Sequence, residues 1–351
     1  MRELRYWQAL SEGLIQAMEA DESVFVMGVG VDDPKGIFGT TLEASRRYGS
    51  KRVFDIPISE NAITGIAIGA SLSGMRPVMV HARNDFILIT LDQLINNASK
   101  WRYTTGGGSH VPITIRTIIG RGWGQGAQHS QSLQAVFAHF PGLKVVMPAT
   151  PYDAKGLLIS SIRDNSPVIF IEHRRLYDNF EPVPEHPYEV PLGKAIIRRR
   201  GTDITIVATS LMVSESLKAA QVLENHNIKA EVIDLRTIKP MDEELIYNSV
   251  RRTHRLLVAD TAWRSFGIGS EVIAKVVENV FSFLVAPAHR IASPDVPAPV
   301  SSTLERLFYP CANDIVTSVN ELMSGKTTRK LALAQVSHSS KLLDEDFHGP
   351  F

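Results

Sequence analysis

Short apolar segments alternate with segments of helical periodicity along most of the chain. In the first half, the apolar segments are residues 23–28, 76–81, 111–116, 143–148 and 167–171. Between them, residues 91–98 and 152–162 place apolar side chains three and four positions apart, which is the spacing of one helix face. Apolar strands separated by helices are typical of a parallel sheet covered on both faces. The pattern therefore predicts an α/β fold.

The alternation is interrupted once. Residues 178–191 carry several acidic side chains and four prolines, a composition typical of an extended linker. A second series of strands and helices follows, from residue 203 to residue 280. We therefore expect two three-layer domains with parallel sheets, residues 1–190 and residues 193–325. Residues 326–351 are polar and form a C-terminal tail.

Composition excludes several classes of protein. The 351 residues include 37 Lys or Arg and 37 Asp or Glu, so no global positive field attracts nucleic acid or an anionic membrane. Net neutrality also favours self-association, as in a subunit of an assembly. The single cysteine, Cys311, excludes an internal disulfide and a cysteine-based zinc site. No apolar run spans a bilayer and the N-terminus lacks an apolar signal core, so we expect a cytoplasmic protein.

One acidic residue stands at the start of an apolar helix. Ser59 is a good helix cap, Glu60 falls in the first turn, and no other charge follows until Arg76. Glu60 is either an exposed charge that the helix dipole stabilises by about 0.3–1 kcal/mol, or a buried working acid. A helix that is apolar on all sides is buried, which would raise the pKa of Glu60. Such a carboxyl can share a proton with a ring nitrogen.

A glycine-rich loop forms the second candidate. Residues 120–126 alternate glycine with other residues and lead to His129, just before an expected helix at residues 133–140. Glycines let the backbone approach a ligand closely, and N–H groups at a helix start favour a neutral imidazole. A plain surface loop is the alternative. The loop is not a dinucleotide fingerprint, because it opens no βαβ unit.

Several motifs resemble one known family. They are Pro57-Ile58-Ser59-Glu60-Asn61, Gln128-His129-Ser130-Gln131-Ser132, and residues 141–146, 154–158, 162–168, 234–242 and 266–271. In order and spacing they are similar to the beta subunit of the thiamine-diphosphate-dependent, decarboxylating component of 2-oxo acid dehydrogenases, such as pyruvate dehydrogenase. The resemblance covers about residues 4–325. It implies a pyrimidine-binding domain followed by a transketolase-type C-terminal domain.

The resemblance also implies roles for individual residues. Glu60 would face the cofactor's aminopyrimidine ring and promote the tautomer that activates the thiazolium. Phe86 would pack against the pyrimidine, and Ile58 would line the same pocket. His129 would face the substrate. Backbone carbonyls match a potassium site of some family members, at Ile113, Ser161, Ile162, Asp164 and Ser166.

A family motif is missing from this chain. The diphosphate half of the cofactor needs a Gly-Asp-Gly motif that holds a divalent metal, and the sequence has none. The resemblance therefore implies an alpha subunit that supplies the diphosphate site and its Mg²⁺, in a two-alpha, two-beta tetramer. It also implies that the chain is inactive by itself.

The resulting hypothesis is an enzyme subunit that decarboxylates a small 2-oxo acid and passes the acyl group to a lipoyl acyltransferase. Arg83 and Asn84 add polarity where family members are apolar. They keep open a second hypothesis, a thiamine-dependent, transketolase-like carboligase subunit that uses no lipoyl group. A third is a non-catalytic scaffold that retains the fold. Neither nucleic acid nor a membrane is an expected partner.

Overall fold

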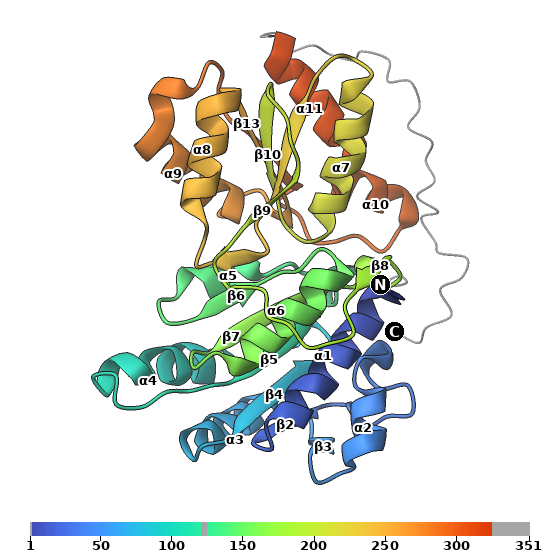
Figure 1. Ribbon diagram of the computed structural model, residues 1–351, viewed down its shortest axis with the longest axis vertical. Coiled ribbons are helices and arrows are strands. Elements are labelled where there is room, and N and C mark those ends of the chain that lie inside the picture. The colour runs from blue at the N-terminus through green and yellow to red at the C-terminus, as the bar shows by residue number, and fades with distance from the viewer. Residues whose placement is uncertain (1, 121–124, 325–351) are drawn as a thin grey trace. The chain divides into compact units, whose positions relative to one another are not determined.

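The computed structural model describes residues 2–120 and 125–324, which form two compact units (Figure 1). The described part of unit 1 consists of residues 2–120, 129–193 and 237–240. The described part of unit 2 consists of residues 125–128, 194–236 and 241–324. Each unit holds its own sheet, so the expectation of two α/β domains is confirmed.

Unit 1 is built on a seven-stranded sheet. Its order is β12-β6-β7-β5-β4-β2-β3, and every neighbouring pair is parallel except β12 with β6. The strands are β2 (Val24–Gly28), β3 (Val53–Phe54), β4 (Arg76–His81), β5 (Thr114–Ile119), β6 (Lys144–Val146), β7 (Val168–His173) and β12 (Thr237–Lys239). All five expected apolar strands of this unit are present. β5 begins three residues later than residue 111, because Pro112 has no N–H and Ile113 N–H closes a tight turn onto the carbonyl of Val111.

The helices of unit 1 follow the apolar periodicity. Two of them, α1 and α6, pack along each other over the sheet (Figure 1). The longer helices are α1 (Tyr6–Ala20), α2 (Leu42–Tyr48), α3 (Glu60–Leu72), α4 (Ser99–Thr104), α5 (Gln134–His139) and α6 (Pro151–Arg163). The 3-10 segments η1 (Ile37–Gly39), η2 (Asn84–Thr90) and η5 (Arg174–Leu176) join them, with a π-helix, η3 (Asp92–Ala98), at the expected residues 91–98.

The expected linker is partly a strand. β8 (Phe180–Val183) pairs antiparallel with β1 (Arg2–Arg5) in a separate two-stranded sheet. Phe180 and Pro182 of β8 are exposed and Glu181 is partly exposed. The composition of this edge strand is therefore also typical of a linker.

Unit 2 has a five-stranded sheet of order β14-β13-β10-β11-β9, in which only β9 is antiparallel. The strands are β9 (Ile196–Arg199), β10 (Ile204–Ala208), β11 (Ala230–Asp234), β13 (Leu256–Trp263) and β14 (His289–Ser293). The helices are α7 (Leu211–Glu224), α8 (Glu243–Thr253), α9 (Ile268–Val280), α10 (Ser302–Phe308) and α11 (Ala312–Ser324), with 3-10 segments η4 (Gly126–Gln128) and η6 (Phe281–Phe283). α8 and α9 cover one face of the sheet, and α7 and α11 cover the other (Figure 1). None of the helices described in either unit is long and apolar enough to cross a membrane.

A buried ion pair joins the two central strands of unit 1. The Arg116 Nε donates to Glu172 Oε1 at 2.6 Å, and both side chains are fully buried. The Tyr177 hydroxyl donates to the other oxygen of Glu172 at 2.6 Å. Removing either charge would leave the other buried and unpaired, which typically costs about 3–5 kcal/mol. The pair therefore fixes β5 against β7.

One glycine is required by a close backbone approach. Gly142 has φ of 97°, and a Cβ added there would lie 1.9 Å from the Ser99 carbonyl oxygen. We predict that Gly142→Ala lowers the free energy of unfolding by about 3 kcal/mol or more, because it adds backbone strain to a clash. Urea denaturation of the purified chain measures this.

Gly106→Ala is the matched control. Gly106 also has positive φ, 60°, but nothing lies within 4 Å of an added Cβ. Strain alone should cost about 1 kcal/mol there. Equal losses in the two variants would contradict the role of the Ser99 contact.

Candidate active site

The candidate site begins where two parallel neighbours in the sheet end. β4 and β5 are paired through His81 and Thr117, so their carboxyl ends lie at the same edge of the unit 1 sheet. The chain that leaves β4 enters η2, which carries Phe86. The chain that leaves β5 returns to unit 1 at His129. Parallel pairing therefore brings two segments more than 40 residues apart to one place, the usual location of ligands in α/β folds.

Three consecutive residues of η2 contact the segment that follows His129. The Asn84 side-chain oxygen accepts from Leu133 N–H at 3.2 Å. One oxygen of Asp85 accepts from the Gln131 side chain at 2.8 Å and from its backbone N–H at 3.3 Å. The Phe86 and His129 rings meet edge to face, with centroids 5.3 Å apart. The predicted residues Phe86 and His129 are thus in contact.

The residues on either side of this contact are also fixed. Gly120, which ends β5, has φ of 83°, and a Cβ there would lie 2.4 Å from the His173 ring. The Arg83 guanidinium donates to the Gly120 carbonyl at 2.8 Å. Residues 121–124 of the glycine-rich loop lie outside the described residues, and the Gly120 end of the loop is held by Arg83.

The helix expected after His129 is present. α5 begins at Gln134, one residue later than expected and five residues after His129. The His129 ring meets Phe86, and its charge interacts with that of Asp85. Burial raises the pKa of the Asp85 carboxyl, while the hydrogen bonds from Gln131 and the charge of His129 oppose the rise.

Glu60 is the first residue of α3, as predicted. Its side chain is nearly buried, with 8% of the residue exposed. Ser59 stands at the capping position but its hydroxyl makes no capping hydrogen bond. No hydrogen bond or ion pair engages the Glu60 carboxylate within the described part of the chain. The acid is therefore open to a ligand.

The expectation that α3 is buried on all sides is wrong for this chain. Thr64, Ala67 and Ile68 pack toward β4 and η2, so the helix that starts at Glu60 lies against the segment of Phe86. The opposite face is exposed, including 62% of Ile66. Ile58, expected to line the cofactor pocket, is 81% exposed. The sequence of α3 has no charged residue after Glu60 and therefore does not indicate which face this chain leaves exposed.

The five residues of the expected potassium site lie around the end of α6. The Ile162 and Asp164 carbonyls accept from the Arg76 guanidinium at 3.0 and 3.2 Å. The Ile113 and Ser161 carbonyls accept backbone N–H groups. A carbonyl oxygen has two lone pairs, so one hydrogen bond does not by itself prevent it from binding a cation. The potassium site stays a prediction.

Comparison with known proteins decides the family. The transketolase pyrimidine-binding domain model matches residues 2–179, and the transketolase C-terminal domain model matches residues 193–315. The beta subunit of acetoin:2,6-dichlorophenolindophenol oxidoreductase of Cupriavidus necator is 42% identical over 92% of this chain and 98% of its own. The pyruvate dehydrogenase E1 beta subunit of Bacillus subtilis is 40% identical over 92% of this chain and 99% of its own. The chain belongs to the family of dehydrogenase beta subunits built from two transketolase-type domains.

A solved structure has the same fold. A split-gene transketolase, described as an inactive beta4 tetramer, superposes with a TM-score of 0.74 over 92% of this chain and 98% of its own. The two sequences are 22% identical, so the likeness concerns the fold alone.

Sequence reasoning overlooked part of this beta subunit's site. Asp85 and Gln131 bind each other beside His129, but neither is among the predicted site residues. The signal was present, because Asp85 directly precedes Phe86 and Gln131 follows His129 by two residues. Nothing in the sequence pairs two segments 46 residues apart before the order of the strands is known.

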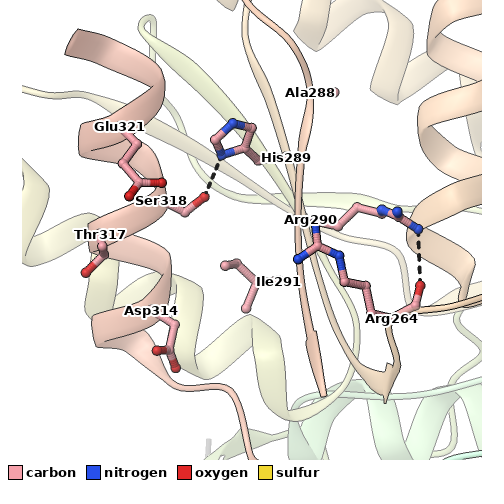
Figure 2. A pocket seen from close by; sticks show the side chains of 9 residues that line it. All are labelled: Arg264, Ala288, His289, Arg290, Ile291, Asp314, Thr317, Ser318 and Glu321. Carbon is pink, nitrogen blue, oxygen red and sulfur yellow. Dashed lines mark hydrogen bonds between the residues drawn. The ribbon is translucent and has the colours of Figure 1, made fainter. Parts of the chain in front are cut away.

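A separate cavity of about 450 Å³ lies in unit 2 of the beta subunit, between β14 and α11 (Figure 2). The Arg264 side chain points into it, and Ser318 meets His289 across it at 2.9 Å. Asp314 and Glu321 line the α11 side. None of the predicted site residues lines this cavity, so it is no part of the candidate active site.

Two buried histidines beside the site make the free energy of unfolding depend on pH. Burial lowers the pKa of His81 to about 4 and, together with Arg175 and Arg83, that of His173 to about 3. The unfolded chain binds protons near pH 6.5, where these native imidazoles stay neutral. The free energy of unfolding should therefore fall as the pH drops from about 6.5 toward 4.

His81→Phe tests this dependence. The His81 Nε2 is buried without a hydrogen-bond partner in the described structure, so a phenyl ring fits its surroundings. We predict that the fall in unfolding free energy between pH 7 and pH 5 becomes shallower, by at most about 1.4 kcal/mol per pH unit. Urea titrations at several pH values measure it, with the exposed His226→Asn as control. An unchanged slope in His81→Phe would contradict the assignment.

Proposed function

We propose that this beta subunit provides the aminopyrimidine side of a thiamine diphosphate site that an alpha subunit completes. The single observation that carries the proposal is the Glu60 carboxylate, nearly buried at the start of α3 and engaged by no described side chain. Bound thiamine diphosphate supplies the electron sink that lets a bond next to a carbonyl break. Glu60 then holds a proton at a pyrimidine ring nitrogen.

The neighbouring side chains have distinct tasks in this proposal. Phe86 packs its ring against the pyrimidine and Ile58 covers the same ring from the loop before α3. His129, set edge-on to Phe86, faces the substrate and moves a proton there. Gln131 and Asn84, through their contacts across the two segments, keep His129 beside Phe86.

Large apolar side chains that are exposed on and near α3 support the partner. Ile66 of α3 is 62% exposed, Ile58 just before the helix is 81% exposed, and Ile89 of η2 is 57% exposed. Apolar side chains that gather on one surface are typical of interfaces. We assign this face to the alpha subunit, which would also carry the diphosphate and its Mg²⁺ in a two-alpha, two-beta tetramer. A potassium ion at the end of α6 and a cytoplasmic location belong to the same proposal.

For the reaction we propose oxidative decarboxylation of a small 2-oxo acid with transfer of the acyl group to a lipoyl carrier. Relatives named pyruvate dehydrogenase beta subunits support it. Oxidation of acetoin is the second candidate, because two relatives at 42% and 41% identity are named beta subunits of acetoin:2,6-dichlorophenolindophenol oxidoreductase. Both reactions place the same demands on Glu60 and His129.

Glu60→Gln tests the assignment of the acid. The amide keeps the size of the side chain but cannot hold the proton, so turnover of the alpha–beta complex should fall at least about 100-fold. Glu43→Gln is the matched control, since Glu43 also stands in the first turn of a helix but is exposed and paired with Arg46. Turnover within threefold of the wild type in Glu60→Gln would overturn the assignment.

Substrate tests separate the candidate reactions. The purified complex is given pyruvate or acetoin, with a lipoyl domain or 2,6-dichlorophenolindophenol as electron acceptor. We expect reduction of the lipoyl group with a 2-oxo acid. Reduction with acetoin alone would favour the second candidate, and a carboligation product without any reduction would contradict both. Failure of the copurified complex to bind thiamine diphosphate in calorimetry would favour a scaffold.

A further inference from the structure

Only one of the two carboxylate oxygens of Asp85 is hydrogen-bonded in the described structure. Asp85 is 8% exposed, and its Oδ1 receives both hydrogen bonds from Gln131. Its Oδ2 is buried and has no hydrogen-bond partner in the described part of the chain. Leaving a buried acceptor unsatisfied typically costs about 1–3 kcal/mol, and more for a charged group. An asparagine would keep the bonds to Gln131 and would place an equally unpaired amide N–H₂ where Oδ2 stands, so stability alone does not explain the acid.

The position of Asp85 gives it one neighbour of chemical interest. The next residue, Phe86, contacts the His129 ring edge to face, and the residue that Asp85 binds lies two positions after His129. Thus one carboxylate oxygen holds Gln131, two residues after His129, and the second oxygen has no partner in the described part of the chain.

We propose that Asp85 is the orienting carboxylate of His129. A neutral imidazole has one N–H and one acceptor nitrogen, and the group that takes the N–H decides which nitrogen faces the substrate. Asp85 Oδ2 has no partner in the described structure, and it accepts that N–H when the imidazole turns toward it in the substrate complex. The arrangement resembles a catalytic base whose ring orientation is fixed by a hydrogen bond to a third group. Asp85 is then a positioning residue that acts through His129, and the inference rests on the proposed role of His129.

Asp85→Asn tests the inference in the alpha–beta complex. The amide oxygen still accepts from Gln131, but the amide nitrogen cannot accept the imidazole N–H. We expect kcat to fall about 10- to 100-fold, within the contribution of an acid–base group. KM, the calorimetric affinity for thiamine diphosphate and the thermal unfolding midpoint should stay within experimental error. Deuterium exchange at the thiazolium of the cofactor should also be unchanged, because that step depends on Glu60.

A double-mutant cycle with His129→Ala gives the decisive readout. If Asp85 acts through His129, the double variant is no slower than His129→Ala alone. Asp178→Asn, at an exposed aspartate of the same unit that pairs with Arg5, is the control and should keep full activity. Losses that multiply in the double variant, or a wild-type kcat in Asp85→Asn, would overturn the inference.

Two further results keep the test decisive. Full activity in His129→Ala would overturn the proposed function of that residue, whereas an inactive His129→Ala beside a fully active Asp85→Asn overturns only the role of Asp85. If Asp85→Asn does not assemble, Gln131→Ala takes its place in the same cycle. Gln131→Ala removes the side-chain donor to the carboxylate and keeps the backbone N–H, so its loss of kcat should likewise vanish on the His129→Ala background.

Discussion

The parallel pairing of β4 with β5 is the constraint on which the candidate site depends. It places the ends of the two strands side by side, so residues 84–86 can contact residues 129–133. The buried Arg116–Glu172 pair holds β5 on its other side. If β4 and β5 were not neighbours, Phe86, Asp85 and His129 would have no common position. The contact between the segments of Phe86 and His129 thus depends on the strand order more than on any single motif.

Within that frame, the two sides of the site are built differently. Glu60 stands on a regular helix, whose first turn fixes the direction of its side chain. His129 stands on a loop and depends on contacts from Asn84, Asp85 and Phe86. Sites on loops need such support to reach catalytic precision. This difference explains why the loop side, and not the helix side, carries a buried acid whose hydrogen bonding is incomplete.

Much of this structure follows from local sequence. Buried strands such as β4 and β7 and the start of α3 at Glu60 could be predicted, because apolar runs and a cap are local signals. β8 and β9 could not, since edge strands keep charged residues such as Glu181, Arg198 and Arg199. The contact between Asp85 and Gln131 needed the strand order. The exposure of Ile66 could not be foreseen, because α3 has no charged residue after Glu60 and its sequence does not distinguish a buried face from an exposed one.

The uncovered face of α3 has a consequence for how a cell can make this protein. A folded beta subunit without its proposed partner exposes the apolar side chains of Ile58 and Ile66 to water. Copies made in excess of the partner would associate with one another through the same face. Balanced synthesis of the two chains, from adjacent genes or one transcript, would limit the time that a beta subunit spends without a partner. The geometry of one helix therefore favours tight control of subunit dosage.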